Sequence, residues 1–183
     1  MAVEDAREGP ELLLSALNGD LVLLEDQDRT RWDRRQIAEG LALLDGVVAE
    51  GALGAYAVQA AIAAAHARAA RAADTDWKQI AALYALLARL SPSPVVELNR
   101  AVAVAMADGP EHGLRILDAI EASGALMDYH LFHAARADLF RRAGRLAAAA
   151  EGYRRALGLT SLEAERRFLV RRLRALEGGG GEE

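Results

Sequence analysis

The chain has 183 residues, enough for one domain with a buried core or for a short array of stacked helices, but too few for two well-formed domains. It contains no cysteine, which excludes disulfides, thiolate metal sites and a cysteine nucleophile. Its net charge of −5 argues against general affinity for nucleic acid, and no apolar run approaches the roughly 20 residues that span a bilayer. We therefore expect a cytoplasmic protein with no membrane partner.

Hydrophobic residues make up 52% of the chain, and much of this fraction is alanine, while aromatic residues make up only 5% of the chain. Alanine has the highest helix propensity and leaves little side chain between two packed backbones. This composition predicts an all-α core built from closely approaching helices.

The first 24 residues contain the only strand-like pattern. Residues 1–10 end in Gly-Pro and are expected to be flexible. An apolar stretch, Leu12–Leu17, is followed by the turn signal Asn18-Gly19 and by a second apolar run, Leu21–Leu24. Because an isolated hairpin is marginal in water and no further strand candidate follows, we expect an extended segment lying on helices instead of a hairpin.

Residues 25–33, EDQDRTRWD, are called the charged segment from here on. Eight of its nine residues are polar or charged, so it must be either a solvated linker or a surface that another protein segment covers. Two interpretations stay open. In one, Trp32 staples the start of the following helix while Arg29 and Arg31 pair with local carboxylates. In the other, the segment contacts a partner.

Eight helices are predicted after this segment, from caps, apolar spacing and Gly or Pro stops. Asp33 can cap the first, whose apolar stripe is expected to be Ile37, Leu41, Leu44 and Val48. Residues 74–76 form a capping cluster for the third, and Ser161 can cap the eighth. The first is predicted to end near Gly51 or Gly54, and the others cover about 53–73, 77–90, 95–106, 111–122, 127–143, 145–157 and 162–176.

A period of about 35 residues runs through these helices. Tyr84 and Tyr153 lie 69 residues apart, and Gly109 and Gly144 lie 35 apart, which is the tetratricopeptide length. The best unit departs from that pattern at Arg136, where leucine is usual, and the middle unit carries an acid at its aromatic position, residue 118. We therefore predict a right-handed α-hairpin array, a tetratricopeptide-like solenoid, with the extended N-terminal segment packed on it.

Chemistry-bearing motifs are sparse. His130 and His133 can share a helix face, with Asp128 as a third ligand or Asp138 as a companion in an enzyme site, but no Glu-x-x-His pattern accompanies them. No dinucleotide loop, Walker lysine or nucleophile elbow occurs. We expect no catalytic residue, no metal and no cofactor.

Seven blocks in order resemble a known family: GDLVLLEDQDRTRWD, IAEGLALLD, GALGAYAVQAAIAAAHARA, DTDWKQIAALYALL, SPSPVVELNRAVAVAMADGPEHGL, YHLFHAARADLFRRAGR and AAAAEGYRRAL. Together they resemble the C-terminal extension of extracytoplasmic-function (ECF) RNA polymerase sigma factors with a tetratricopeptide-like tail. The resemblance implies a non-enzymatic domain that regulates transcription initiation through the sigma regions, with RNA polymerase as a second candidate partner. The chain shows no helix-turn-helix, so direct DNA binding is not expected.

The resemblance and the patterns together define the expected organisation. Residues 1–32 form a flexible start and the charged segment, residues 33–176 the helical-repeat domain, and residues 177–183 a disordered tail. The alternative function is a general peptide-binding scaffold with an unrelated partner. The predicted partner interface consists of Asp26, Asp28, Arg29, Arg31 and Trp32, with Asn99 and Arg100 as additional residues on the array.

Overall fold

The computed structural model describes residues 13–15, 21–51 and 54–178. Within them the chain forms an all-α array of eight α-helices, as predicted, together with one small sheet and three short 3-10 turns. The helices are α1 (Arg34–Ala49), α2 (Ala55–Arg68), α3 (Trp77–Leu90), α4 (Pro94–Asp108), α5 (Pro110–Ala122), α6 (His130–Arg142), α7 (Leu146–Leu159) and α8 (Glu163–Gly178). The predicted flexible start at 1–10 and most of the predicted tail lie outside the described residues, but Glu177 and Gly178 belong to α8.

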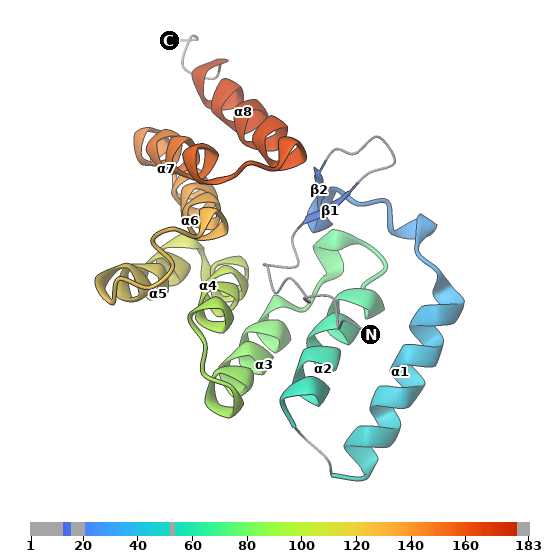
Figure 1. The fold of residues 1–183 in the computed structure, drawn as a ribbon. Coiled ribbons are helices and arrows are strands. Elements are labelled where there is room, and N and C mark those ends of the chain that lie inside the picture. Colours follow the sequence, from blue (N-terminus) through green and yellow to red (C-terminus); the bar gives the residue numbers. More distant parts are fainter. Residues whose placement is uncertain (1–12, 16–20, 52–53, 179–183) are drawn as a thin grey trace, which may run out of the picture.

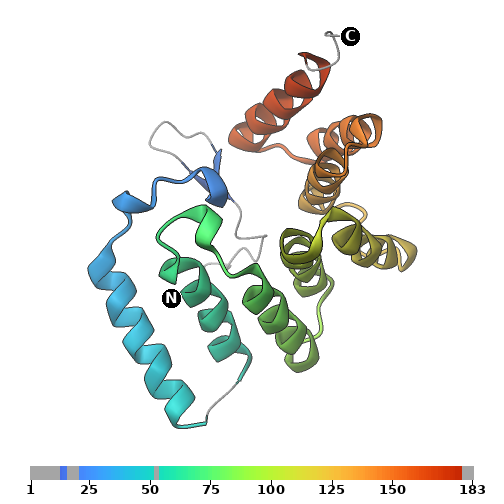
Figure 2. The ribbon, with the colours of Figure 1, turned by 180° about the vertical axis from the view of Figure 1, so that it is seen from behind.

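Each helix packs against the next one along the chain, and α4 also contacts α6. Figures 1 and 2 show the resulting curved row, with α1 at one end and α8 at the other. Two groups of buried side chains hold it together. One is centred on α2, α3 and α4, and the other extends from α4 to α8, so α4 is the wall that both share. The identity of the repeat as a tetratricopeptide-like, right-handed solenoid remains a prediction.

Glycine and proline end and begin helices where the sequence predicts. Pro110 occupies the first turn of α5, where its missing N–H costs no hydrogen bond. Gly144 follows α6 with φ of 74°, a left-handed conformation that disfavours side chains, and the next N–H bonds back to Phe140 O at 2.8 Å. Asp33 and Asp76 accept hydrogen bonds from the first-turn amides of α1 and α3, as expected for N-caps.

Two other predicted caps are wrong. Asp74 does not cap α3; its carboxylate accepts two 2.8 Å hydrogen bonds from Arg71. Before α8, the hydroxyl that accepts an N–H belongs to Thr160 and not to Ser161, and the donor is Leu162 N at 3.2 Å. Asp76 therefore caps α3 in place of Asp74, and Thr160 takes the role before α8 that spacing had assigned to Ser161.

The N-terminal apolar segments form a hairpin, which corrects the expectation of an extended segment. Strands β1 (Leu13–Ser15) and β2 (Leu21–Leu23) pair antiparallel, with Leu14 opposite Val22. The predicted turn at Asn18-Gly19 lies outside the described residues. The hairpin is not isolated, because β2 contacts α8 and the views in Figures 1 and 2 place the sheet between α8 and the α2–α3 connection. Packing on helices therefore supplies the stability that two strands alone lack.

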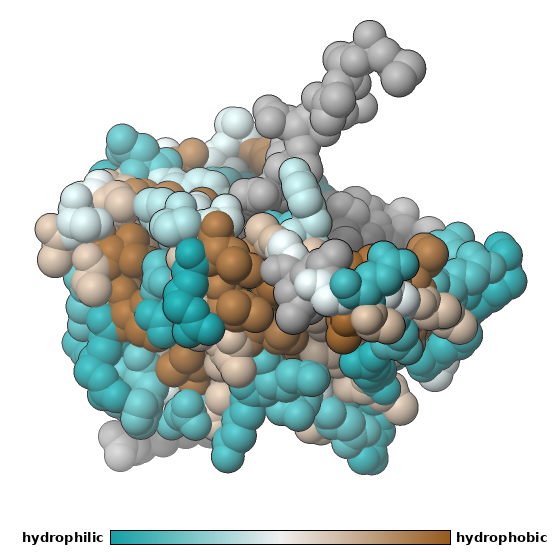
Figure 3. All heavy atoms as spheres, turned by 90° about the horizontal axis from the view of Figure 1, so that it is seen from below, coloured by the Kyte–Doolittle hydropathy of each residue, from teal (hydrophilic) through white to brown (hydrophobic). Residues whose placement is uncertain are grey.

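Helix α1 is less buried than its predicted stripe implies. Leu44 is buried, but Val48 at the end of the stripe is 49% exposed, and Leu43 on another face is 74% exposed. The reason is position: α1 lies at the end of the row, and its main helix contact is with α2. Figure 3 shows apolar atoms gathered in a band across the middle of the face seen from below, bordered by hydrophilic atoms.

Small residues set the spacing between helices. A Cβ on Gly113 of α5 would lie 2.5 Å from Ala101 O and 2.6 Å from Ala105 Cβ, both on α4. A Cβ on Gly152 of α7 would lie 2.9 Å from Ala137 Cβ on α6. These distances are shorter than real Cβ contacts, so the α4–α5 and α6–α7 pairs approach as closely as glycine permits.

We predict that Gly113→Ala destabilises the protein by about 1–3 kcal/mol, because the added methyl overpacks against backbone that cannot move freely. Gly40→Ala on α1 is the matched control: its Cβ meets nothing within 4 Å, so helix propensity should stabilise it by about 0.5–1 kcal/mol. Urea unfolding followed by circular dichroism measures both. Equal effects at the two positions would contradict close packing at Gly113.

Candidate functional site

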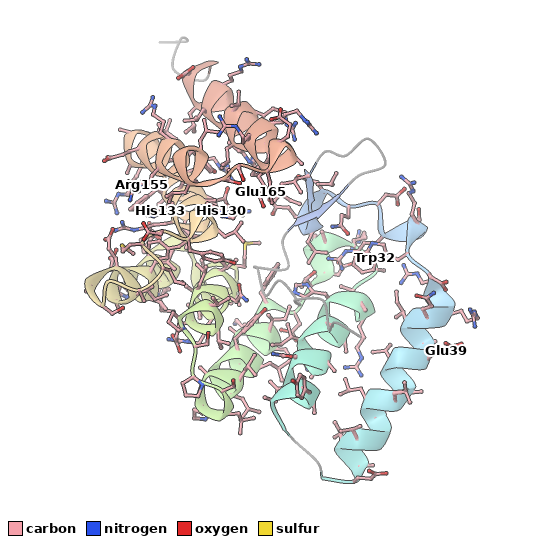
Figure 4. All side chains as sticks on the ribbon, in the orientation of Figure 1. Trp32, Glu39, His130, His133, Arg155 and Glu165 are labelled. Carbon is pink, nitrogen blue, oxygen red and sulfur yellow. The ribbon has the colours of Figure 1, made fainter. Side chains whose placement is uncertain are left out.

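The charged segment folds into two 3-10 turns, η1 (Leu24–Asp26) and η2 (Arg29–Arg31). Asp28 caps η2: its Oδ1 accepts hydrogen bonds from Thr30 N at 3.0 Å and from Thr30 Oγ1 at 2.6 Å. These bonds, the side-chain one first, lower the pKa of Asp28 below its ordinary value. Trp32 then leads directly into the Asp33 cap of α1, at the corner seen in Figure 4. The segment therefore has a defined local structure of its own.

Arg29 anchors this segment to the array. Its side chain is 4% exposed, and Nη1 donates to His66 O and to Ala69 O, each at 2.9 Å. Nη2 donates to Thr75 Oγ1 at 3.1 Å, and the guanidinium carbon lies 4.9 Å from the centre of the Trp32 ring. His66 and Ala69 carry carbonyls at the C-terminal end of α2, the negative end of the helix dipole. Arg29 is thus a helix cap supplied from a distant part of the chain.

This cap explains where α2 ends. The helix was predicted to continue to residue 73, but it ends at Arg68, and residues 72–74 form the separate turn η3 (Ala72–Asp74). Ala69 has an extended ψ of 120°, which turns its carbonyl away from helical geometry. Binding of that carbonyl by Arg29 satisfies a backbone group that the interrupted helix leaves without a partner.

His66 lies beneath the anchor and is buried. Its ring meets Trp77 edge to face with centroids 5.2 Å apart. Desolvation first, and the positive charge of Arg29 second, lower the pKa of His66 from 6.5 to about 4. His66 is therefore neutral at physiological pH, and protonation would place a second cation next to Arg29.

Glu25 makes the second connection between the charged segment and the array. Both of its carboxylate oxygens accept from Arg142 Nη2 at 2.9 Å, across 117 residues of sequence. Arg142 Nε donates to Asp138 Oδ2 at 2.7 Å, and Asp138 Oδ1 also accepts from Arg141 at 2.7 Å and from the Tyr153 hydroxyl at 3.3 Å. The segment is thus fixed to α2 through Arg29 and to α6 through Glu25.

Burial and charge act in opposite directions in this second cluster. Burial disfavours the charged form of Asp138, but hydrogen bonds and charges of Arg142 and Arg141 outweigh it and lower the carboxyl pKa. Desolvation also opposes the charge on Arg142, and Asp138 and Glu25 reverse the effect, so its pKa is raised. Burial, followed by the Asp138 charge, raises the pKa of Tyr153 to about 12. Asp138, Arg142 and Tyr153 therefore keep their ordinary charge states at neutral pH.

Between the two anchors lies a pocket of about 340 Å³, which we call the concave pocket. Its walls come from β2 and η1, from η3, and from α3, α4, α6, α7 and α8. Most of the described residues that line it are apolar, and the exceptions are Glu25, Arg29, Asp138 and Arg142. The charged segment therefore forms one side of an apolar pocket whose other sides are helices.

The predicted interface residues have different surroundings. Arg29 is a correction: it is buried, and its hydrogen-bond partners are two carbonyls and a hydroxyl, so it is neither a free surface residue nor paired with a local carboxylate. Trp32 is half-buried against it. Asp26, Asp28 and Arg31 are exposed, and their assignment to an interface remains a prediction.

Asn99 and Arg100 lie on α4, away from this exposed group in the sequence. Asn99 is one turn before Val102 on the helix face that contributes Val102 and Met106 to the concave pocket. Arg100 forms an ion pair with Glu97 of its own helix at 2.7 Å. Sequence reasoning missed Glu25 as an anchor and Arg142 altogether, since nothing in the sequence connects positions 117 residues apart.

The histidine pair is directed to two different partners. His130 Nε2 lies 2.9 Å from Glu165 Oε2 of α8, off the alignment of a good hydrogen bond, and His133 Nε2 lies 2.8 Å from Met127 O. Figure 4 shows both histidines on α6, with Glu165 nearby on α8. Asp138 binds arginines instead. Across residues 21–51 and 54–178 no three His, Asp or Glu side chains gather in a way that could hold a metal ion.

Comparison with known proteins shows similarity to a region of a longer bacterial protein. The chain is 44% identical over 152 residues to an uncharacterized protein of Rhizobium meliloti. The match covers 83% of this chain and 36% of that protein, so the chain spans about a third of the relative's length. No protein family and no solved structure matches the chain. A region similar to this array therefore occurs within a longer protein. In the described part of the chain, no helix combines the length and apolar character needed to cross a membrane.

We predict that Arg29→Ala destabilises the protein by about 2–4 kcal/mol, because it removes three hydrogen bonds from a charged donor and leaves buried acceptors unpaired. Arg31→Ala, two residues away and exposed, should change stability by less than about 0.5 kcal/mol. Chemical unfolding of the two variants provides the comparison. Similar midpoints for both would show that Arg29 is not an anchor.

The lowered pKa of His66 predicts that the stability of the protein depends on pH. Because its folded pKa lies below the ordinary 6.5, the unfolded chain binds the proton first, so its contribution is complete above pH 6.5 and is lost as pH falls toward 4. We expect a loss of about 2 kcal/mol over this window, after allowance for partial solvent access. The measurement is urea unfolding of wild type and His66→Gln at several pH values, with exposed His112→Gln as control. If the free energies of unfolding of wild type and His66→Gln fall by the same amount between pH 6.5 and 4, the lowered pKa of His66 is contradicted.

Proposed function

We propose that this chain is a non-enzymatic regulatory domain of an ECF-type sigma factor, which acts in the cytoplasm and controls transcription initiation by contacting the sigma regions. RNA polymerase is the second candidate partner, and no direct contact with DNA is needed. The seven sequence blocks that resemble the sigma-factor extension support this proposal. The similarity to a region of a longer Rhizobium protein is compatible with an array that works as part of a larger chain.

One observation carries the proposal: the charged segment is folded onto the array by two anchors while part of it faces outward. Arg29 and Glu25 are bound within the chain, so the segment cannot act as a loose tether. Asp26, Asp28 and Arg31 remain exposed beside these anchors. A segment held this rigidly can orient a neighbouring domain with respect to the helices, which a flexible linker does not do.

The exposed charges fit a specific protein contact. Two exposed acids, Asp26 and Asp28, are followed by an exposed base, Arg31, so a partner must match their order as well as their net charge. Such groups set the register and association rate of a complex more than its total affinity. Because Asp28 is fixed by its bonds to Thr30, at least one of these charges is already oriented before a partner arrives.

The alternative is a peptide-binding scaffold that takes an unrelated segment into its groove, and the concave pocket favours it. The pocket is apolar and concave, as peptide grooves in helical arrays are. The two proposals differ in the surface used: the first requires the outward charges of the charged segment, whereas the second requires the helix-lined pocket. They can therefore be separated with surface variants.

We predict that Arg31→Glu weakens binding of the chain to purified sigma regions at least about tenfold, about 1.4 kcal/mol, because it places an acid where the partner meets a cation. The sigma regions should be those encoded with this chain or next to it in the genome, and binding is measured by titration calorimetry. Arg115→Glu on α5 is the matched control, because this arginine is also exposed and lies outside the charged segment, and it should bind like wild type.

If Arg31→Glu binds the sigma regions as tightly as wild type does, the charged segment is not part of the interface. Absence of binding by the wild-type chain at micromolar concentration would contradict the sigma-factor proposal and favour the scaffold. Helix content from circular dichroism should be the same for both variants, since neither arginine makes a buried contact.

A further inference from the structure

The two ends of the helical row have different outer surfaces. At the C-terminal end, α8 carries Arg167, Arg171 and Arg174 at spacings of four and three, and all three are exposed. A polar outer face of this kind keeps the terminal helix of an array soluble. At the other end the outer surface of α1 is partly apolar, although α1 also terminates the row. One end of the row is therefore closed by a polar helix, and the other is not.

Exposed apolar side chains gather at the α1 end. Among the described residues seven large apolar side chains are exposed, and four of them lie on α1 and in the first turn of α2: Leu43, Val47, Val48 and Tyr56. Figures 1 and 2 show α1 at the edge of the row, with α2 on its inner side and no other described helix beyond it. Apolar surface at an open edge favours contact with another protein surface.

Helical spacing defines which residues of α1 point away from α2. Leu44 is buried and marks the inner side. The opposite side consists of six exposed residues, which we call the α1 outer face: Arg35, Glu39, Ala42, Leu43, Gly46 and the C-cap residue Glu50. The side chain of Leu43 is 74% exposed, so most of its apolar surface meets solvent in the single chain.

The α1 outer face is shaped for another helix with small residues. Ala42 and Gly46 stand beside Leu43, and a Cβ on Gly46 would meet nothing within 4 Å. The distance between two packed helices depends on the side chains at their contact, so small residues permit a close approach. A leucine from a second helix can then lie over Ala42 and Gly46. The α1 outer face carries both the leucine and the space for one, so it is complementary to itself.

The charges of this face are also complementary to themselves. The face begins with a base, Arg35, and ends with an acid, Glu50. In an antiparallel pair of α1 helices with its centre between Ala42 and Leu43, Arg35 of each copy lies opposite Glu50 of the other. A two-fold axis forms both contacts at once, and the opposed helix dipoles favour the same orientation.

The ion pair that Arg35 makes within its own helix does not prevent this contact. Arg35 Nη1 lies 2.9 Å from Glu39 Oε1, and the two side chains are 76% and 62% exposed. An exposed pair of this kind contributes little to stability, and a guanidinium has further N–H groups for a second acid. Arg35 can therefore bind Glu50 of another copy without losing Glu39.

We propose that two copies of this chain associate through antiparallel packing of their α1 outer faces. Leu43 of each copy packs on Ala42 and Gly46 of the other, and Arg35 pairs with Glu50 at both ends of the contact. A single helix pair is a small interface, so the dimer is weak and forms as the protein concentration rises. This inference goes beyond the proposed role in transcription and does not depend on it.

Sedimentation equilibrium of the full chain, from about 10 μM to about 1 mM, tests the proposal. The mean mass should rise from that of one chain toward that of two. Leu43→Glu should weaken association at least about tenfold, because it places two acids in the apolar centre of the contact. Leu146→Glu in the first turn of α7, where the leucine is 45% exposed, is the matched control and should associate like wild type.

A charge exchange tests the antiparallel orientation. Glu50→Arg should weaken association at least about tenfold, because two arginines then face each other at both ends of the contact. The double variant Arg35→Glu with Glu50→Arg restores opposite charges and should associate within about threefold of wild type. All of these positions are exposed, so circular dichroism should show the same helix content in every variant.

Several results would overturn the inference: a single-chain mass at every concentration, a mass that continues to rise beyond two chains, unchanged association of Leu43→Glu, or no recovery in the double variant. If the chain stays monomeric and Leu43→Glu weakens its binding to sigma regions, the α1 outer face belongs to that partner and the dimer is wrong. Sedimentation of the chain alone involves no sigma regions, so the dimer and the proposed function can fail independently.

Discussion

The hydrogen bonds of Arg29 are the interaction on which the arrangement of this protein depends. A single guanidinium binds the C-terminal carbonyls of α2, the hydroxyl of Thr75 before α3, and stacks near Trp32 before α1. It thereby fixes the end of one helix, the connection to the next and the path of the charged segment at the same time. A planar donor with several fixed N–H groups suits this role, and lysine could not satisfy the same acceptors together.

Close helix packing is the second constraint, and it comes from composition. Alanine and glycine at the contacts of α4 with α5 and of α6 with α7 let backbones approach until no methyl group fits. Larger buried side chains, among them Leu117, Phe132 and Tyr153, fill the core around these close contacts. Ion pairs also join the helices, as where Arg136 of α6 binds Asp118 and Glu121 of α5. Both Arg136 and Asp118 are departures from the repeat pattern, and the structure shows that they compensate each other.

Local sequence predicted the helices well where the caps and stops are local. Asp33, Asp76, Pro110 and Gly144 act within one turn of their own position, so their effects follow from neighbouring residues. The end of α2 could not be predicted in the same way, because the group that caps it lies about 40 residues away. The stability of the hairpin was predicted to be too low for a similar reason. The contact of β2 with α8 cannot be inferred from the sequence of either element.

The candidate site also combines features that local sequence predicts with features that depend on distant contacts. The unusual composition of EDQDRTRWD drew attention to a segment that is folded onto the array, but it did not tell which of its charges face inward. The charged composition and the family resemblance assigned Arg29 to a partner surface, whereas the structure buries it. Glu25, which had no assigned role, fixes the segment to Arg142. Two long-range contacts, of Arg29 with α2 and of Glu25 with α6, make this polar stretch one wall of an apolar pocket. The same contacts hold the exposed Asp26, Asp28 and Arg31 in a fixed position relative to the helices.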